Sequence, residues 1–109
     1  MAWQEAMNLA VLAYHVSSGF PKEETYGLAA QVRKSAVSIP SNIAEGAARN
    51  SSRELRQFLG ISAGSLAELE TQLELAKRLK YFPVDAAILR QAQTVGMLLH
   101  ALRRSCAKE

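Results

Sequence analysis

Arginines gather around one predicted helix start, and this is the grouping most suggestive of chemistry. Arg49, Arg53 and Arg56 flank the run Ser-Ser-Arg-Glu at residues 51–54, which matches a capping box with Ser51 as the N-cap. A helix N-terminus presents free N–H groups that attract anions, whereas a cation in its first turn opposes the helix dipole. The pattern therefore favours a partner that carries phosphates.

Two further observations bear on this cluster. Arg33 and Lys34, on the preceding predicted helix, add two cations that we count among the predicted phosphate contacts. Glu45 and Glu54 support the opposite interpretation, in which they neutralise the arginines. The formal net charge of +3 on 109 residues fits either interpretation, because it is also an ordinary charge for solubility. Both interpretations stay open at this point.

The remaining reactive side chains form no pattern typical of catalysis or metal binding. The chain has two histidines, His15 and His100, and one cysteine, Cys106. No Glu is followed by His three residues later, as in the di-iron bundles, and no Gly-rich phosphate loop is present. We therefore expect a non-enzymatic protein without catalytic residues, metal, cofactor or small-molecule substrate.

Helical periodicity predicts the elements that must position these residues. The helices are expected over residues 2–16, from between 23 and 28 to about 47, from 52 to about 79, and from 83 onward. Pro83 and Asp85 suit the first turn of the last helix, and residues 103–109 are expected to fray. Short connections between long helices imply antiparallel neighbours. The sequence predicts an all-α, antiparallel up-down-up-down four-helix bundle, with residues 1–109 as its single domain.

The apolar residues exceed what one bundle core needs. In the first helix, Trp3, Met7, Ala10 and Tyr14 form the predicted core stripe. A second apolar face remains on that helix, and the last helix carries apolar residues off its own stripe. Because exposed apolar patches usually mark interfaces, we predict a homo-oligomer. The predicted interface residues are Leu9, Leu12, Val16, Leu89 and Met97.

Composition limits the class of protein. Apolar residues make up 49% of the chain, which is typical of a packed domain, and a single cysteine excludes a disulfide framework. No apolar run approaches the roughly 20 residues that span a bilayer. We expect a soluble cytoplasmic protein with no membrane partner.

Three segments resemble a known family. Residues 26–46, which include the specific run Ser-Ile-Pro-Ser-Asn-Ile-Ala-Glu-Gly, resemble the bacterial four-helix bundle proteins, among them proteins encoded in intervening sequences of large-subunit ribosomal RNA genes. Residues 3–7 and 58–70 match the same family. The chain is also similar to the accessory protein of diversity-generating retroelements. That resemblance implies a pentameric ring that binds nucleic acid through a basic surface.

Two functions follow as hypotheses. The first is a homo-oligomeric bundle that binds RNA or a ribonucleoprotein, with the arginines as phosphate contacts. The second is a structural or protein-interaction scaffold, in which the basic residues only keep the ring soluble.

Overall fold

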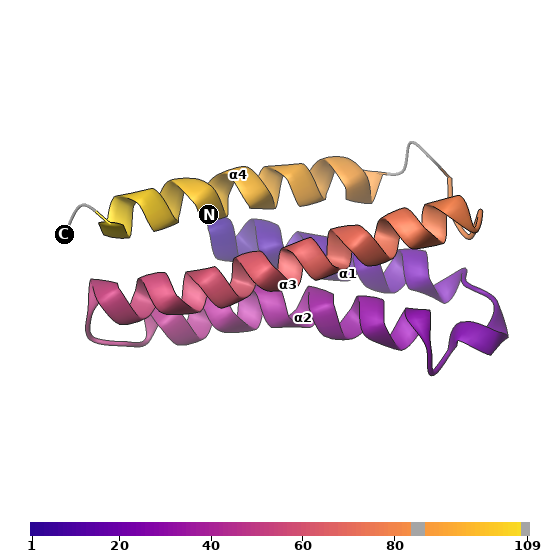
Figure 1. Cartoon of the computed structure of the whole chain (residues 1–109), viewed down its shortest axis with the longest axis horizontal. Helices are drawn as coiled ribbons and strands as arrows, with labels where there is room; N and C mark the ends of the chain where they lie inside the picture. The colour runs from indigo at the N-terminus through magenta and orange to yellow at the C-terminus, as the bar shows by residue number, and fades with distance from the viewer. Residues whose placement is uncertain (84–86, 108–109) are drawn as a thin grey trace.

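Four long helices make up the computed structural model, which describes residues 1–83 and 87–107 (Figure 1). The helices are α1 (Ala2–Ser18), α2 (Leu28–Ala47), α3 (Ser52–Arg78) and α4 (Ala87–Ala107), with a short 3-10 turn, η1 (Lys22–Glu24), between α1 and α2. Consecutive helices run in opposite directions, and α1 also packs against α4. The predicted four-helix bundle is confirmed. Within the described residues, no helix is both long and apolar enough to cross a membrane.

The bundle has two distinct ends (Figure 1). The α2–α3 turn and the last turns of α4 form one end, which we call the arginine end. The segment that contains η1 and the α3–α4 connection form the other, which we call the loop end. At the arginine end, α1 begins short of the level that α2, α3 and α4 reach (Figure 1). The last turns of α4 therefore lie beside α3 in a part of the bundle that α1 does not reach.

The α3 boundaries follow from local chemistry. The Ser51 hydroxyl accepts a hydrogen bond from the Glu54 backbone N–H at 3.1 Å, which confirms the predicted N-cap. At the other end, Lys80 adopts a left-handed conformation with φ 64°, and the Tyr81 N–H donates to the Ala76 carbonyl at 2.9 Å. This is the pattern of a Schellman motif, which satisfies the last carbonyls of a helix.

Helix α4 differs from its prediction at both ends. Pro83 lies in the connecting segment, while Asp85 belongs to residues 84–86, which are outside the described residues. The predicted fraying from Arg103 is wrong, because α4 continues as a helix to Ala107. Near this end of α4, the half-buried Cys106 packs against the core.

The core follows the predicted stripes of α2, α3 and α4. Val32 and Ile39 of α2, Leu69 of α3 and Val95 of α4 are fully buried. Leu102, the last residue of the predicted α4 stripe, is exposed instead. Burial of these aliphatic side chains supplies the main favourable free energy of the fold.

Helix α1 is oriented differently from the prediction. Its buried face consists of small residues and one leucine, and its bulky residues point outward. The buried residues of this helix are Ala2, Ala6, Leu9, Ala10, Ala13 and Ser17. Trp3, Met7 and Tyr14, which we predicted in the core, are exposed. Alanines let α1 approach its neighbours closely, so the large side chains have no space between the helices.

Polar side chains join α2 to α3 around Pro40, which α2 accommodates without interruption. The Ser62 hydroxyl of α3 donates to the Ile39 carbonyl at 2.9 Å, and Ser38 and Ser65 share a hydrogen bond of 2.7 Å. Asn42 donates to the Ser38 carbonyl at 2.8 Å. Proline lacks an N–H and disturbs helical bonding around it, so these side-chain bonds stabilise the helix there.

Candidate nucleic-acid interface

Three arginines surround one hollow at the arginine end. Antiparallel packing brings the first turns of α3 beside the last turns of α4, so Arg53 and Arg56 face Arg103 across the interhelical groove. The hollow has a volume of about 450 Å³. Its lining residues are Arg53, Arg56, Gln57, Gly60 and Arg103, and we call it the arginine hollow. No carboxylate lines it, so its electrostatic potential is positive.

None of the three arginines has a partner within residues 1–83 and 87–107. The ion pairs of this part of the chain involve other cations, and no hydrogen bond holds Arg53 or Arg56. The Nε of Arg103 is buried without an acceptor. A buried unsatisfied donor costs about 1–3 kcal/mol, so a ligand that supplies an acceptor gains this free energy back.

The third arginine was missed by the sequence analysis. Arg103 was placed in a fraying tail, whereas the structure keeps it helical and half-buried. Antiparallel pairing of the last two helices is the signal that would have found it, because that pairing sets the end of α4 beside the start of α3.

Arg49 lies at the same end but is engaged by its own neighbours. Its guanidinium pairs with Glu45 at 2.8 Å and sits 4.9 Å from the centre of the Phe58 ring. Glu45 therefore neutralises Arg49, as the second interpretation of the cluster predicts. Glu54 forms no ion pair with Arg53 or Arg56.

Arg33 and Lys34 lie far from the arginine hollow. Ala47 is fourteen positions after Arg33 in α2, a rise of about 21 Å along the helix. Arg33 donates to the Ser17 hydroxyl at 2.8 Å and to the Ser18 hydroxyl at 3.2 Å, and it covers the Tyr14 ring at 4.8 Å. Its side chain thus ties α2 to α1. Lys34 lines a separate polar groove between α2 and α3.

The predicted interface residues also need correction. Leu9 is 0% exposed and belongs to the core, so it is not available to another copy. Leu12, Val16 and Leu89 are half-buried against the core. Met97, which is 67% exposed, does lie on the surface. We predicted the large apolar side chains of α1 on its buried face, because large apolar residues usually mark a core. The structure places them on the exposed face.

The unpartnered apolar surface of α1 is instead a stripe of four large residues. They recur at helical spacing on one side of the helix, bordering α2, where Arg33 covers Tyr14. We call Trp3, Met7, Val11 and Tyr14 the apolar stripe; Trp3 is 45% exposed and Val11 54%. Val37, one turn after Arg33 on α2, is exposed as well.

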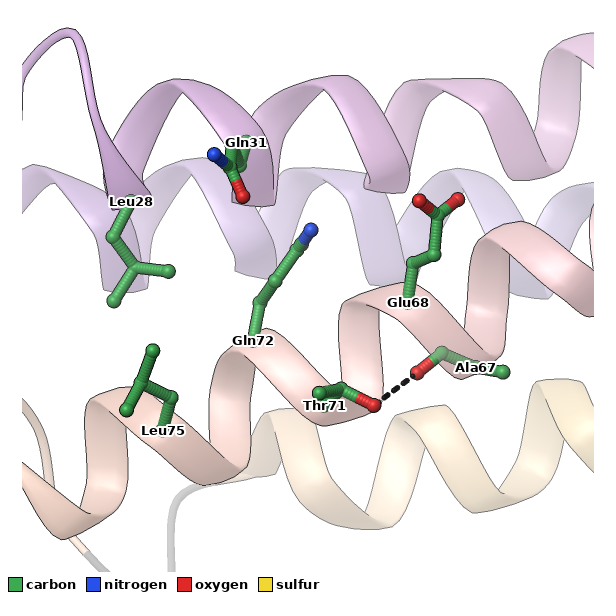
Figure 2. Close-up of a pocket in the computed structure, with 7 residues that line it drawn as sticks. All are labelled: Leu28, Gln31, Ala67, Glu68, Thr71, Gln72 and Leu75. Atoms are coloured by element: carbon green, nitrogen blue, oxygen red, sulfur yellow. Dashed lines mark hydrogen bonds between the residues drawn. The ribbon is translucent and has the colours of Figure 1, made fainter.

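A second hollow, of about 430 Å³, lies between α2 and α3 (Figure 2). Leu28 and Leu75 line one part of it, and Gln72 extends from α3 toward Gln31 on α2 (Figure 2). The Oε1 of Gln72 is buried without a donor among the described residues. Glu68 is the one carboxylate among the lining residues, so the hollow offers amides and apolar contacts rather than an acid–base pair.

A third hollow, between α3 and α4, contains titratable groups. Glu70 and His100 both line it, together with the exposed Met97. Burial raises the pKa of the Glu70 carboxyl above its ordinary value of 4.5. Across the described part of the chain, no three His, Cys, Asp or Glu side chains gather as a metal site would require.

Comparisons with known proteins agree with this fold. A family model described as 23S rRNA-intervening sequence protein matches residues 1–101. A crystal structure from Bacteroides thetaiotaomicron, described as a protein with unknown function from the S23 ribosomal protein family, superposes with a TM-score of 0.71. The two chains are 18% identical, with 99% of this chain and 96% of the other covered, and at that identity the likeness concerns the fold alone. No curated protein matches this chain.

Proposed function

The chain belongs to the 23S rRNA-intervening sequence protein family, and from that premise we propose that it is a non-enzymatic, homo-oligomeric bundle that binds RNA through the phosphates. Arg53, Arg56 and Arg103 are the principal contacts, and Arg49 adds a further cation at the same end. Arg33 and Lys34 lie outside this surface.

One observation carries the proposal: three arginines converge on the arginine hollow without a carboxylate or hydrogen-bond partner among the described residues. Guanidinium groups that repel one another lower the stability of the free protein slightly, and phosphates remove that repulsion. Guanidinium geometry also matches phosphate oxygens in two parallel hydrogen bonds. Arg53 stands at the second position of α3, where a cation opposes the helix dipole, so its placement gives the isolated fold no advantage.

The oligomeric part of the proposal rests on the apolar stripe. Four large side chains on one face of α1 are exposed, and a second copy would remove them from water. A ring multiplies a weak phosphate-binding patch, because one RNA molecule reaches several copies at once. Five copies is the number that the resemblance to the retroelement accessory protein implies.

Binding of structured RNA at several salt concentrations tests the RNA role. We expect measurable affinity at low salt that falls steeply as salt rises, because counterions are released from the phosphates. The double variant Arg53→Glu, Arg56→Glu should lose binding. The matched control is Lys22→Glu, Lys80→Glu, which changes the net charge equally at the loop end and should retain binding. Affinity that is independent of salt, or equal losses in both variants, would contradict the proposal.

Light scattering tests the assembly. We expect a mass of five times the 11.9 kDa protomer, reduced to one protomer in the variant Trp3→Gln, Met7→Gln. The control removes two exposed apolar residues from α3 instead, Ile61→Gln and Leu75→Gln, and should leave the mass unchanged. A wild-type mass of a single protomer at all concentrations would exclude a ring.

A protein-interaction scaffold is the second candidate, and the apolar stripe is the observation that favours it. The ratio of absorbance at the nucleic-acid and protein maxima of the freshly purified protein separates the two. Co-purified RNA raises this ratio, whereas a scaffold gives the ratio of protein alone.

A further inference from the structure

We propose that the arginine hollow is a binding site for a terminal phosphate monoester, the phosphorylated end of an RNA chain. This inference rests on the proposed RNA binding and names the chemical group that the site takes. Arg53, Arg56 and Arg103 hold the phosphate, and Gln57 contributes an amide beside it.

Charge is the first argument. Three guanidinium groups share one hollow whose lining contains no carboxylate. An internal phosphodiester brings one negative charge and two free oxygens. A terminal monoester brings between about 1.5 and 2 negative charges at neutral pH, and three oxygens that accept hydrogen bonds. The terminal group therefore compensates three clustered cations better than an internal one does.

Shape is the second argument. The hollow of about 450 Å³ is a shallow, open depression between α3 and α4, large enough for a phosphate group that both helices contact. Gly60 has no side chain on the α3 side of the hollow. The Arg103 Nη2 lies 3.7 Å from the position that a Cβ on residue 60 would occupy. The Arg103 side chain thus extends from α4 to the α3 backbone, while Arg53 and Arg56 come from α3. A ligand in the hollow would therefore meet cations from two helices.

The unsatisfied Nε of Arg103 is the third argument. The described protein supplies no acceptor for this buried donor. In the proposed complex, the Arg103 side chain turns toward the hollow so that Nε and Nη2, the edge that binds two phosphate oxygens in parallel, both face the phosphate. The neighbouring Arg104 is exposed and does not line the hollow, so it provides a matched control.

Residue 103 also lies beyond residue 101, where the family match ends. The family match therefore does not include the third cation.

Fluorescence anisotropy with three versions of one RNA oligonucleotide tests the site: 5′-phosphate, 3′-phosphate and both ends hydroxyl. A fourth titration repeats the 5′-phosphate version with inorganic phosphate as competitor. We expect at least one phosphorylated version to bind about tenfold more tightly than the hydroxyl version. The preferred end identifies the source of the monoester. Competition at millimolar inorganic phosphate would show that the phosphate group itself is recognised.

Variants and pH sharpen the test. Arg103→Gln should abolish the preference and weaken the binding of hydroxyl-ended RNA only by the loss of one cation, whereas Arg104→Gln, which removes the same charge outside the hollow, should keep the preference. The preference should also decline below about pH 6, where the doubly charged monoester takes up one proton and becomes a monoanion. Equal affinities for phosphorylated and hydroxyl ends would overturn the end site and leave RNA binding standing. No affinity for any of the oligonucleotides would overturn both.

Discussion

At the loop end, Arg33 donates to two serine hydroxyls of α1, and Arg78 pairs with Glu74 at 2.9 Å. At the arginine end, Arg53, Arg56 and Arg103 face a common hollow without such partners among the described residues. Arg33 joins α2 to α1 and Arg78 pairs within α3, so the charges of this first group are used within the fold. The second group adds repulsion to the free protein. The contrast separates cations that stabilise the structure from cations that are available to a ligand.

The tyrosine at the loop end reinforces this contrast. The Tyr81 hydroxyl donates to Glu24 Oε2 at 3.0 Å, and the other oxygen of that carboxylate accepts from the Leu28 N–H at 3.0 Å. The hydrogen bond to Glu24 raises the pKa of the Tyr81 hydroxyl above its ordinary value of 10.0. Glu24 thus links the η1 turn to both α2 and the α3–α4 connection, and the loop end uses its polar groups internally.

The strongest test of the comparison is Gly46→Ala, where α2 meets α3 beside the arginine end. A Cβ at residue 46 would lie 2.8 Å from the Phe58 Cβ and 3.1 Å from Leu55 Cδ1. We expect a loss of about 1–3 kcal/mol in the free energy of unfolding, because α3 must move away. Urea denaturation measures it. The control Gly64→Ala, with nothing within 4 Å, should gain up to about 1 kcal/mol from helix propensity. Equal shifts in the two variants would contradict the close packing at Gly46.

Arg33→Gln should have the next largest effect. It removes two hydrogen bonds and the contact with the Tyr14 ring, so we expect a loss of about 1 kcal/mol in the free energy of unfolding. RNA affinity should decrease only slightly, because the variant removes one positive charge that lies far from the arginine hollow. A variant of unchanged stability with weakened RNA binding would reverse the roles we assign to the two ends.

Arg53→Gln should behave in the opposite way. Removing a cation from the first turn of α3 should stabilise the protein by about 0.3–1 kcal/mol. RNA affinity should fall, and its logarithmic salt dependence should decrease by about one unit. Thermal denaturation and salt titration of binding measure the two effects on the same sample. A loss of stability would show that Arg53 has a structural partner.

Glu74→Gln should have the smallest effect. Hydrogen bonds from Arg78 and then Lys77 hold the pKa of the Glu74 carboxyl below its ordinary value of 4.5. A lowered folded-state pKa stabilises the protein above that value, and the contribution is lost as pH falls through the lowered pKa. The variant should therefore show a slightly smaller decrease in Tm on acidification than the wild type. The control Glu68→Gln, at an exposed residue without an ion pair among the described residues, should follow the wild type.

Most of the fold could be predicted from the sequence because periodicity and capping are local. Ser51 and Glu54 sit three residues apart, and their hydrogen bond depends on nothing distant. The stripe that contains Val32 and Ile39 is buried because helical spacing alone places these residues on one face. Short connections then leave few arrangements for four long helices.

The site was predicted only in part because it depends on which residues meet across helices. Arg53 and Arg56 were identified from their unusual position at a helix start. Arg103 was missed, because its role arises from the antiparallel neighbour and not from its own surroundings in the chain. The orientation of α1 was wrong for a similar reason: Leu9 and Trp3 are both apolar, and only the spacing between helices decides which of them fits inside.

On α1, the alanines that pack against the bundle and the large apolar residues that stay exposed lie on different faces. A single apolar face usually serves both folding and association. Ala6 and Ala13 are fully buried against the neighbouring helices, whereas the large side chains at positions 3, 7, 11 and 14 are between 38% and 54% exposed. Random substitution would therefore replace those bulky side chains with polar ones over generations unless another selective constraint preserves them. Deep mutational scanning for solubility alone, compared with scanning for biological activity, would reveal whether such a constraint exists.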